Sequence, residues 1–252
     1  MTDKPKQAPP ISEARFKQIG DHCGTDKTLH HGYHRFYPAH IAHLRRFKKF
    51  AIIEIGFGSG NSIPLWLTIF PDALLICLDR DHQEEGPRYR VLKADQSSAD
   101  SLQKSISNVD LPIRLVIDDG SHKPSHQMLT FSTIFPRLCE DGIYIIEDIE
   151  TSYWTGGSIY GYETRYGLFN QWSAVEAFKL AVDYANRSCL APCDLNLLEY
   201  RMAIVGLTPE AVGMIGSITF AQNCIIIRKA KATDLEFINA PYPHLQNTNR
   251  DP

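Results

Sequence analysis

The chain has 252 residues and a mass of 28.5 kDa; 43% of the residues are hydrophobic and 22% are charged. This globular composition excludes long disorder and collagen-like repeats, and the length allows one large domain or one domain with a small appendage. The 26 basic and 29 acidic side chains give a net charge of −3, which argues against a nucleic-acid-binding protein, because such proteins usually carry a basic excess.

Residues 1–49 read as a helical segment that precedes the main domain. The first ten residues contain three prolines and lack the apolar stretch of a secretory signal, so we expect a frayed leader. Ser12 is the predicted N-cap of a short helix that extends to Ile19. Residues 37–49 have apolar side chains at helical spacing and a basic end, which predicts a surface helix.

From residue 50 onward, short apolar runs alternate with helical patterns. Such strand–helix alternation, with nearly continuous apolar strands, predicts an α/β fold with a parallel sheet covered on both faces. The expected strands lie at 51–56, 73–79, 113–119 and 142–148, and the expected helices at 61–70, 97–107 and 125–138. We expect this main domain to span residues 50–232.

After residue 148 the alternation breaks. The stretch 153–172 is rich in Gly, Tyr and Trp and is too long for a tight turn, which is typical of a lid or binding loop. A helix is expected at 171–184 and two further strands at 197–205 and 222–229, antiparallel at the sheet edge. The tail 233–252 is expected to fray.

The cysteines and the hydropathy bear on the compartment. The six cysteines are scattered without a Cys-x-x-Cys pair, so reduced thiols are expected rather than a zinc site or a disulfide framework. No apolar stretch approaches the roughly 18 residues of a membrane helix. We expect a cytoplasmic protein that does not associate with a membrane.

A glycine-rich loop follows the first expected strand. Gly56, Gly58 and Gly60 are spaced G-x-G-x-G, whereas a dinucleotide fingerprint needs a third glycine where this chain has Asn61. Glu54 would repel a pyrophosphate but tolerate a cation or an amine. The loop therefore suits an adenosine ligand other than a dinucleotide, and an oxidoreductase that uses a nicotinamide nucleotide is the weaker alternative.

Acidic side chains end the neighbouring strands. Asp79 is placed to accept hydrogen bonds from both ribose hydroxyls, and Asp95 to bind an adenine amino group. Asp119, Glu147 and Asp148 would repel one another at one rim of the sheet unless a cation neutralised them, and oxygen ligands favour Mg²⁺. Asp118 should point to the opposite face, because strand side chains alternate, and a structural role is the alternative there.

His122 lies three residues after Asp119, in the turn that follows the strand. A neutral imidazole beside a metal can take the proton of a hydroxyl group, whereas a histidine in an ordinary loop is more often solvated than catalytic. His126 follows four residues later, but Pro124 and the missing glutamate of an HExxH pattern argue against a zinc pair. We interpret His126 as a capping or supporting residue.

Several motifs together resemble the class I S-adenosylmethionine-dependent methyltransferases. These are ExGxGxG, ADQS, and more narrowly GTDKTLHHGYHRFY at 24–37, IDDGSHKPSHQ at 117–127 and IYIIEDIETSYW at 143–154. The narrower set is similar to the metal-dependent sugar O-methyltransferases of macrolide biosynthesis, the mycinamicin and tylosin type, over residues 20–155. The resemblance implies a doubly wound, mostly parallel, seven-stranded Rossmann-like sheet. Larger members have an additional N-terminal domain, which we expect this chain to lack.

The resemblance also implies ligands and residue roles. Mg²⁺ would bind Asp119, Glu147 and Asp148, with His122 as general base; Lys27 would pair with the donor's carboxylate and Tyr33 would cover its sulfonium. Tyr153 and Trp154 would stack on the sugar, or else be core aromatics. The expected S-adenosylmethionine-binding residues are Thr25, Lys27, His31, Tyr33, Glu54, Gly56, Gly58, Gly60, Asn61, Ser62, Asp79, Asp95, Gln96 and Asp118.

The function expected from these features is methyl transfer to a sugar hydroxyl of a glycoside or polysaccharide precursor. The partner would be a small-molecule or oligosaccharide acceptor, with a homo-oligomer as an open possibility and no nucleic acid. Two alternatives remain: a catechol-type O-methyltransferase acting on an aromatic diol, and a noncatalytic scaffold that retains cofactor binding.

Overall fold

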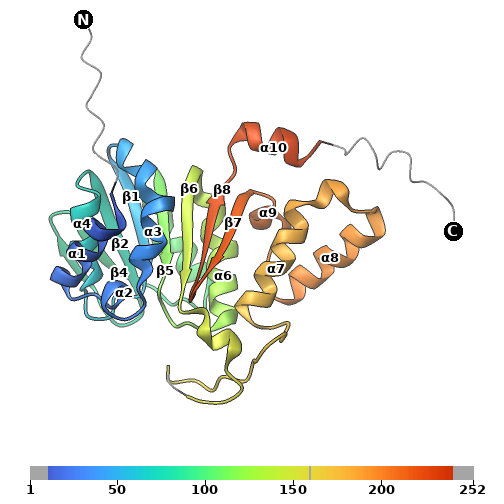
Figure 1. Ribbon diagram of the computed structural model, residues 1–252, viewed down its shortest axis with the longest axis horizontal. Helices are drawn as coiled ribbons and strands as arrows, with labels where there is room; N and C mark the ends of the chain where they lie inside the picture. The colour runs from blue at the N-terminus through green and yellow to red at the C-terminus, as the bar shows by residue number, and fades with distance from the viewer. Residues whose placement is uncertain (1–10, 159, 241–252) are drawn as a thin grey trace, which may run out of the picture.

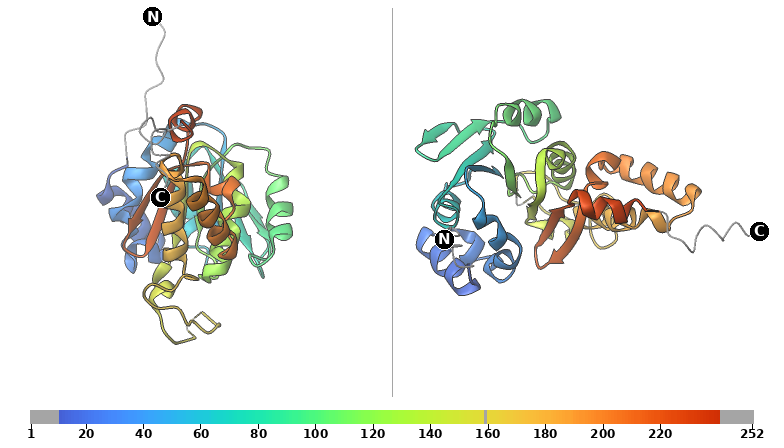
Figure 2. Two further views of the ribbon diagram at one scale, coloured as in Figure 1. Left: turned by 90° about the vertical axis from the view of Figure 1, so that its right-hand side faces the viewer. Right: turned by 90° about the horizontal axis from the view of Figure 1, so that it is seen from above.

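The computed structural model describes residues 11–158 and 160–240, so the predicted leader at 1–10 and most of the predicted tail lie outside the described residues. One mixed sheet runs through the molecule, with helices on both faces (Figures 1 and 2). The strand order is β3-β4-β2-β1-β5-β6-β8-β7. The strands are β1 (Phe50–Ile55), β2 (Ala73–Asp79), β3 (Glu84–Gly86), β4 (Tyr89–Lys93), β5 (Ile113–Asp118), β6 (Leu138–Glu147), β7 (Ile215–Ala221) and β8 (Cys224–Lys229).

The central strands are parallel, as predicted. β1 pairs in parallel with β2 and β5, and β4 and β6 extend this parallel core, while β3, β7 and β8 join in antiparallel fashion. Every residue of β1 is buried, which explains its continuous apolar sequence: both faces of a central parallel strand are covered by helices. The doubly wound α/β prediction is confirmed.

Two details of the predicted sheet are wrong. The sheet has eight strands rather than seven, because the short strand β3 pairs at the edge with β4. Its sequence, EEG, has no apolar alternation that would reveal a strand. The segment 197–205 is not a strand; it belongs to α8 (Pro192–Ile204), whose buried residues Leu198 and Met202 are spaced by four positions, one turn of helix.

Helices form a layer on each side of the sheet. One layer contains α1 (Glu13–Cys23), α2 (Asp26–Leu29), η1 (Tyr33–Arg35), α3 (Tyr37–Ile41), η2 (Ala42–Arg46) and α4 (Ser62–Ile69). The other contains α5 (Ala99–Ser107), α6 (Pro124–Ile134), η3 (Phe135–Arg137), α7 (Ala174–Ala185), η5 (Arg187–Cys189), α8 and α9 (Pro209–Val212). The view from above in Figure 2 separates the two layers. The remaining helices are η4 (Ile149–Tyr153), directly after β6, and α10 (Ala232–Ile238).

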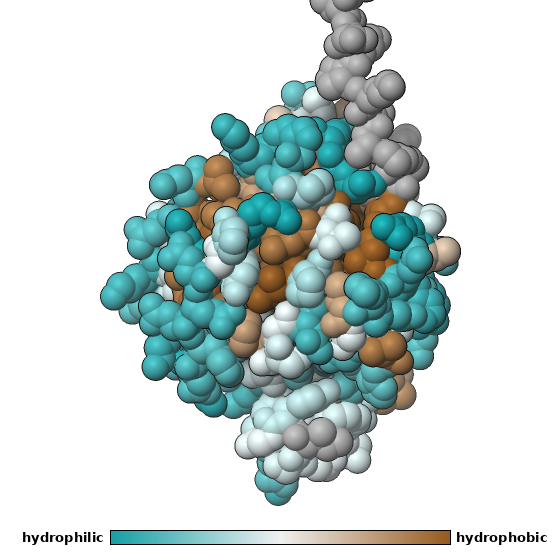
Figure 3. Space-filling model, turned by 90° about the vertical axis from the view of Figure 1, so that its left-hand side faces the viewer, coloured by the Kyte–Doolittle hydropathy of each residue, from teal (hydrophilic) through white to brown (hydrophobic). Residues whose placement is uncertain are grey.

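The N-terminal helices are part of the core. Ser12 caps α1 by accepting a hydrogen bond from the Arg15 amide, as predicted. The buried ring of Phe16 contacts those of Tyr37 and Trp66 edge-on, with centroids 5.9 and 6.1 Å apart. On this side of the molecule, hydrophobic side chains show between hydrophilic ones (Figure 3).

The six cysteines are free thiols. Within residues 11–158 and 160–240, every helix is too short or too polar to cross a lipid bilayer.

Candidate functional site

A cavity of about 710 Å³ opens at the carboxyl ends of the central strands. Ligands of open α/β sheets bind at this edge. Most of the predicted site residues line the cavity: Thr25, Lys27, His31, Gly56, Gly58, Asn61, Ser62, Asp79, Asp95, Gln96, Asp119, His122 and Asp148. Seven predicted residues do not belong to its lining: Tyr33, Glu54, Gly60, Asp118, Glu147, Tyr153 and Trp154.

The glycine loop forms one wall of the cavity because its backbone approaches the end of β5 closely. Gly56 has a φ of 92°, and a Cβ atom placed there would lie 2.2 Å from the carbonyl oxygen of Asp119. Gly58 also has a positive φ, of 54°, but faces open space. The side-chain amide of Asn61 donates to the carbonyl of Gly24 at 3.0 Å, which ties the loop to the N-terminal segment.

Asp79 organises the neighbouring wall. Its carboxylate accepts hydrogen bonds from the backbone amides of Phe57 at 3.0 Å, Asp81 at 2.8 Å and His82 at 2.9 Å. Partial burial opposes the charge, but the amide donors, led by that of Asp81, outweigh it and lower the pKa of Asp79. The group that sequence analysis assigned to a ribose is therefore an ionised acceptor at the cavity wall.

Gln96 connects the cavity to a buried carboxyl group behind it. Its Nε2 donates to Oδ1 of Asp118 at 2.7 Å, and its Oε1 accepts from the Ser121 amide at 2.8 Å. Burial raises the pKa of Asp118 to about 7. Asp118 faces away from the cavity, which agrees with the expected alternation and differs from its assignment as a cofactor ligand. Asp95, by contrast, is exposed at the cavity.

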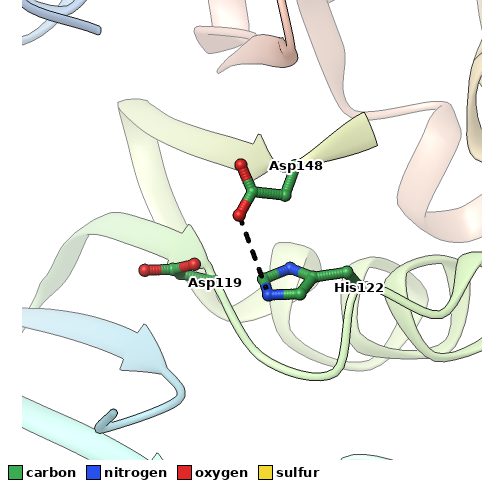
Figure 4. Close-up of side chains that lie close together, drawn as sticks. All are labelled: Asp119, His122 and Asp148. Atoms are coloured by element: carbon green, nitrogen blue, oxygen red, sulfur yellow. Dashed lines mark ion pairs between the residues drawn. The ribbon is translucent and has the colours of Figure 1, made fainter. Parts of the chain in front are cut away.

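Asp119, His122 and Asp148 come together at one end of the cavity (Figure 4). Each offers one atom that can bind a metal, and these atoms lie within 4.8 Å of one another. Nε2 of His122 is 3.7 Å from Oδ2 of Asp148, while Nδ1 is buried without a hydrogen-bond partner among residues 11–158 and 160–240. Burial, together with the nearby Asp119 charge, raises the pKa of Asp148.

The backbone explains why Asp148 reaches the cavity and its neighbour does not. Asp148 has a φ of 53°, in the left-handed region, and directly follows the end of β6. His122, in the loop after β5, has a φ of 55°. Both residues hold the left-handed conformation, which is uncommon for residues other than glycine and is enriched among Asn, Asp and His.

Glu147, the third predicted metal ligand, is not one of these three residues, and its role toward a metal stays a prediction. It is buried, and its two oxygens accept hydrogen bonds at 2.7 Å, Oε2 from the Lys27 ammonium and Oε1 from the Tyr37 hydroxyl. Burial and the charge of Asp119 raise its pKa well above the usual value, against the opposing effect of Lys27. Asp119 and Asp148 meet His122, and Asp119 also shares the Lys27 ammonium with Glu147.

Lys27 connects three carboxylates at the lining of the cavity. Its Nζ lies 2.5 Å from Asp119 Oδ2, 2.7 Å from Glu147 Oε2 and 3.4 Å from Glu54 Oε1, and the side chain is only 1% exposed. Desolvation disfavours the buried ammonium, but the three carboxylates more than compensate and raise the pKa of Lys27 well above its usual value. Lys27 therefore holds an internal charge cluster at the lining of the cavity, and its pairing with a donor carboxylate stays a prediction.

Tyr33 and Glu54 support this arrangement from behind the cavity. The Tyr33 hydroxyl donates to Oδ1 of Asp148 at 2.7 Å, and its ring stacks between those of His31 and Tyr37, each at 5.1 Å. Tyr33 is fully buried, so it does not cover the cavity. Glu54 accepts hydrogen bonds from Ser62 at 2.7 Å and Trp66 at 3.0 Å.

Sequence analysis missed Tyr160, which lines the cavity. Its ring lies 4.4 Å from that of His122 and stacks on Trp154 at 5.7 Å, and its hydroxyl donates to Glu150. Tyr153, a predicted substrate residue, is half exposed away from the cavity. The Gly- and Tyr-rich loop was recognised from its composition, but composition alone does not indicate which tyrosine turns inward.

Comparison with known proteins gives relatives that match about half of this chain. No family model matches it. The 8-demethyl-8-alpha-L-rhamnosyl tetracenomycin-C 2'-O-methyltransferase of Streptomyces olivaceus is 38% identical over 142 residues, 52% of this chain and 36% of that protein. The mycinamicin VI 2''-O-methyltransferase of Micromonospora griseorubida is 34% identical over 135 residues, 49% of this chain and 33% of that protein. The resemblance to sugar O-methyltransferases of antibiotic pathways is confirmed, and the chain spans about a third of the length of these relatives.

Solved structures agree on the fold. MycE methyltransferase from mycinamycin biosynthesis, in complex with Mg, SAH and mycinamycin VI, aligns with a TM-score of 0.68 and 22% identity, over 86% of this chain and 54% of that one. A second crystal form, with Mg and SAH, gives 0.71 and 23%, over 86% and 53%. The sheet and its helices therefore have the architecture of this Rossmann-like methyltransferase.

Proposed function

We propose that this chain carries out S-adenosylmethionine-dependent, Mg²⁺-dependent methylation of a sugar hydroxyl on a glycoside. The observation that carries the proposal is the cavity at the strand ends, which joins a glycine loop to the cluster of Asp119, His122 and Asp148. Relatives named as sugar O-methyltransferases and the fold shared with MycE support it. A small-molecule glycoside is the proposed acceptor, and a cytoplasmic location stays a prediction.

The donor is proposed to bind along the glycine loop. Gly56 lets the backbone approach the end of β5, Asp79 provides an ionised acceptor for ribose hydroxyls, and exposed Asp95 faces the adenine end. The N-terminal segment, whose Thr25 and His31 reach the cavity, would close over the other end of the donor. The donor supplies an electrophilic methyl group on a sulfonium.

The acidic end of the cavity suits a hard divalent cation. Two carboxylates and one imidazole offer ligand atoms within 4.8 Å of one another, and the Asp119 side chain remains 26% exposed. When bound, the cation lowers the pKa of the acceptor hydroxyl and fixes its position. Asp119 and Asp148 are the proposed ligands, with His122 beside them.

His122 is proposed to remove the hydroxyl proton. Its Nε2 is the ring nitrogen near Asp148, and that carboxylate stabilises the imidazolium that forms after proton transfer. The ring is held against Tyr160, and its backbone carbonyl accepts hydrogen bonds from Thr151 and Tyr162 at 3.0 and 2.6 Å. These contacts orient the base before the acceptor binds.

Calorimetry and an acceptor screen test the proposal. Binding of S-adenosylhomocysteine, and turnover of a glycoside panel that EDTA abolishes and Mg²⁺ restores, are expected. A panel of catechols assayed in parallel distinguishes the aromatic-diol alternative. Absence of donor binding, or turnover indifferent to EDTA, would contradict the proposal, and donor binding without turnover of any acceptor would favour a noncatalytic scaffold.

A further inference from the structure

The loop between η4 and α7 contains a hollow that is separate from the cavity at the strand ends. This loop hollow has a volume of about 540 Å³ and is lined by Glu163, Arg165, Tyr166, Asn170 and Trp172. The two linings share no residue. The loop, yellow in Figure 1, projects beyond the body of the molecule. The volume of the loop hollow lies within the range of small-molecule sites, about 300–1,000 Å³.

Asn170 holds the two aromatic walls of the loop hollow in place. Its side-chain amide donates to the carbonyl of Tyr166 at 3.1 Å, and its Oδ1 accepts from the backbone amide of Trp172 at 3.0 Å. The Trp172 residue is 46% exposed, so its ring is accessible to a ligand. A ring on a backbone that is already fixed loses little conformational freedom when a ligand stacks on it, which favours binding.

Glu163 and Arg165 form the polar wall. Nε and Nη2 of Arg165 donate to Oε1 of Glu163 at 2.8 and 2.6 Å. The two side chains are 59% and 74% exposed, and an ion pair with this exposure contributes little to stability. Because both hydrogen bonds end on Oε1, Oε2 is left, among the described side chains, to accept from a ligand. The polar wall therefore offers both an acceptor and donors to the hollow.

An aromatic face beside an acceptor and several donors suits a pyranose ring. The C–H bonds on one face of such a ring are positively polarised and pack against the negative face of an indole. The hydroxyl groups lie around its edge, where each can donate to a carboxylate and accept from a guanidinium. An apolar ligand would instead desolvate Glu163 and Arg165 without offering them new hydrogen bonds. The loop hollow therefore favours a sugar over an apolar aglycone.

A series of contacts joins the loop hollow to the candidate base. The backbone amide of Tyr166 donates to the carbonyl of Trp154 at 2.8 Å, and the Trp154 ring stacks on that of Tyr160. The Tyr160 ring in turn lies 4.4 Å from that of His122. We propose that the loop hollow binds a second sugar unit of the acceptor, beyond the unit that carries the reacting hydroxyl, an inference that rests on the proposed function and narrows its acceptor to glycosides with at least two sugar units.

Nuclear magnetic resonance tests sugar binding directly, without donor, Mg²⁺ or turnover. The probes are disaccharides of glucose, galactose, mannose and rhamnose, and 1-naphthol represents an apolar aglycone. We expect at least one disaccharide to shift the backbone amide signals of residues 163–172, with a dissociation constant of about 1–10 mM. The 1-naphthol probe should leave these signals in place.

Substitutions on the same loop show whether the indole is responsible. Trp172→Ala should weaken disaccharide binding by at least about tenfold, and Trp172→Phe, which keeps an aromatic face, should recover most of the affinity. Phe169→Ala is the matched control: it removes a ring that is 75% exposed on this loop but does not line the hollow, and it should bind as the parent chain does. With a two-sugar acceptor, Trp172→Ala should raise KM by at least about fivefold and change kcat little.

The outcomes separate the sugar site from the proposed function. Amide signals that stay in place with every disaccharide at about 50 mM would overturn the inference, as would equal losses of affinity in Trp172→Ala and Phe169→Ala. Shifts caused by 1-naphthol and by no disaccharide would assign the loop hollow to an apolar aglycone and also overturn it. An unchanged KM for the two-sugar acceptor in Trp172→Ala would exclude the hollow from acceptor binding. Disaccharide binding by a chain that methylates no acceptor would instead contradict the proposed function.

Discussion

The ring of Tyr160 lies against the imidazole of His122, with centroids 4.4 Å apart and planes tilted by 54°. The two residues come from separate loops, the first after β6 and the second after β5. Trp154 also stacks on the Tyr160 ring, and Glu150 accepts a hydrogen bond from the Tyr160 hydroxyl. The loop thus contributes an aromatic wall directly beside the candidate base.

This wall should matter for acceptor binding. Tyr160→Ala removes the ring, so we expect a KM for the acceptor raised by about tenfold, equivalent to about 1.4 kcal/mol of binding, and a lower kcat because His122 loses its support. Tyr160→Phe keeps the ring and should retain most of the activity. Steady-state kinetics checks both variants, with Tyr200→Ala on the exposed face of α8 as control. An unchanged KM in Tyr160→Ala would exclude Tyr160 from the acceptor site.

The proposed base can be separated from the donor site. His122→Ala should lower kcat by about 100-fold or more, the usual contribution of a general base, and leave S-adenosylhomocysteine affinity within about twofold. The substitution His22→Ala, at an exposed position of α1, is the matched control. Single-turnover kinetics and calorimetry provide the two measurements. A kcat reduced less than fivefold would assign proton removal to another group.

The two glycines of the loop should respond differently to alanine. Gly56→Ala combines a φ of 92° with a Cβ atom 2.2 Å from the Asp119 carbonyl, so we expect a loss of about 2–4 kcal/mol in the free energy of unfolding. Gly58→Ala has only the strain of a left-handed φ and open space, and should lose about 1 kcal/mol. Urea denaturation measures the difference in the free energy of unfolding between the two variants, provided that their free energies depend on urea concentration with the same slope. Equal losses would show that the loop relaxes away from β5.

His126 should make stability sensitive to acid. Burial, assisted by the charge of Lys123, lowers the pKa of His126 below its usual value of 6.5, so the folded chain favours the neutral ring. The unfolded chain binds the proton first as pH falls, so the stabilisation is present above about pH 6.5 and is lost below it. Melting temperatures between pH 8 and pH 5 should therefore fall less steeply in His126→Gln than in the parent chain. His22→Gln, an exposed control, should follow the parent, and equal slopes for all three would contradict the prediction.

The central fold was predictable because its signals are local. Continuous apolar runs such as that of β1 identify buried parallel strands, and Ser12 identifies the start of α1. The strand prediction for 197–205 was wrong because the apolar residues of this segment are compatible with both a strand and a helix. Packing against the core stabilises the helix. β3 carries no pattern of its own and depends on its partner β4.

The sequence predicted which segments meet at the site, but it did not predict which side-chain atoms contact one another there. Strand ends placed Asp119, Glu147 and Asp148 at one rim, as the parallel sheet requires. Which of these carboxylates faces the cavity depends on the left-handed conformation of Asp148 and on the contact between Lys27 and Glu147. Neither feature follows from the spacing of residues in the sequence. Tyr160 depends on the path of a long loop, which has no periodicity to read.

The long separation between Lys27 and its partners has a consequence for how the chain acquires its structure. The lysine is synthesised early, yet Glu147 emerges from the ribosome 120 residues later. Closing so large a loop is slow and entropically unfavourable, so the N-terminal helices dock late, after the first β–α units have assembled. Until then we expect Glu54, Asp119 and Glu147 to face a partly built sheet without their counter-charge.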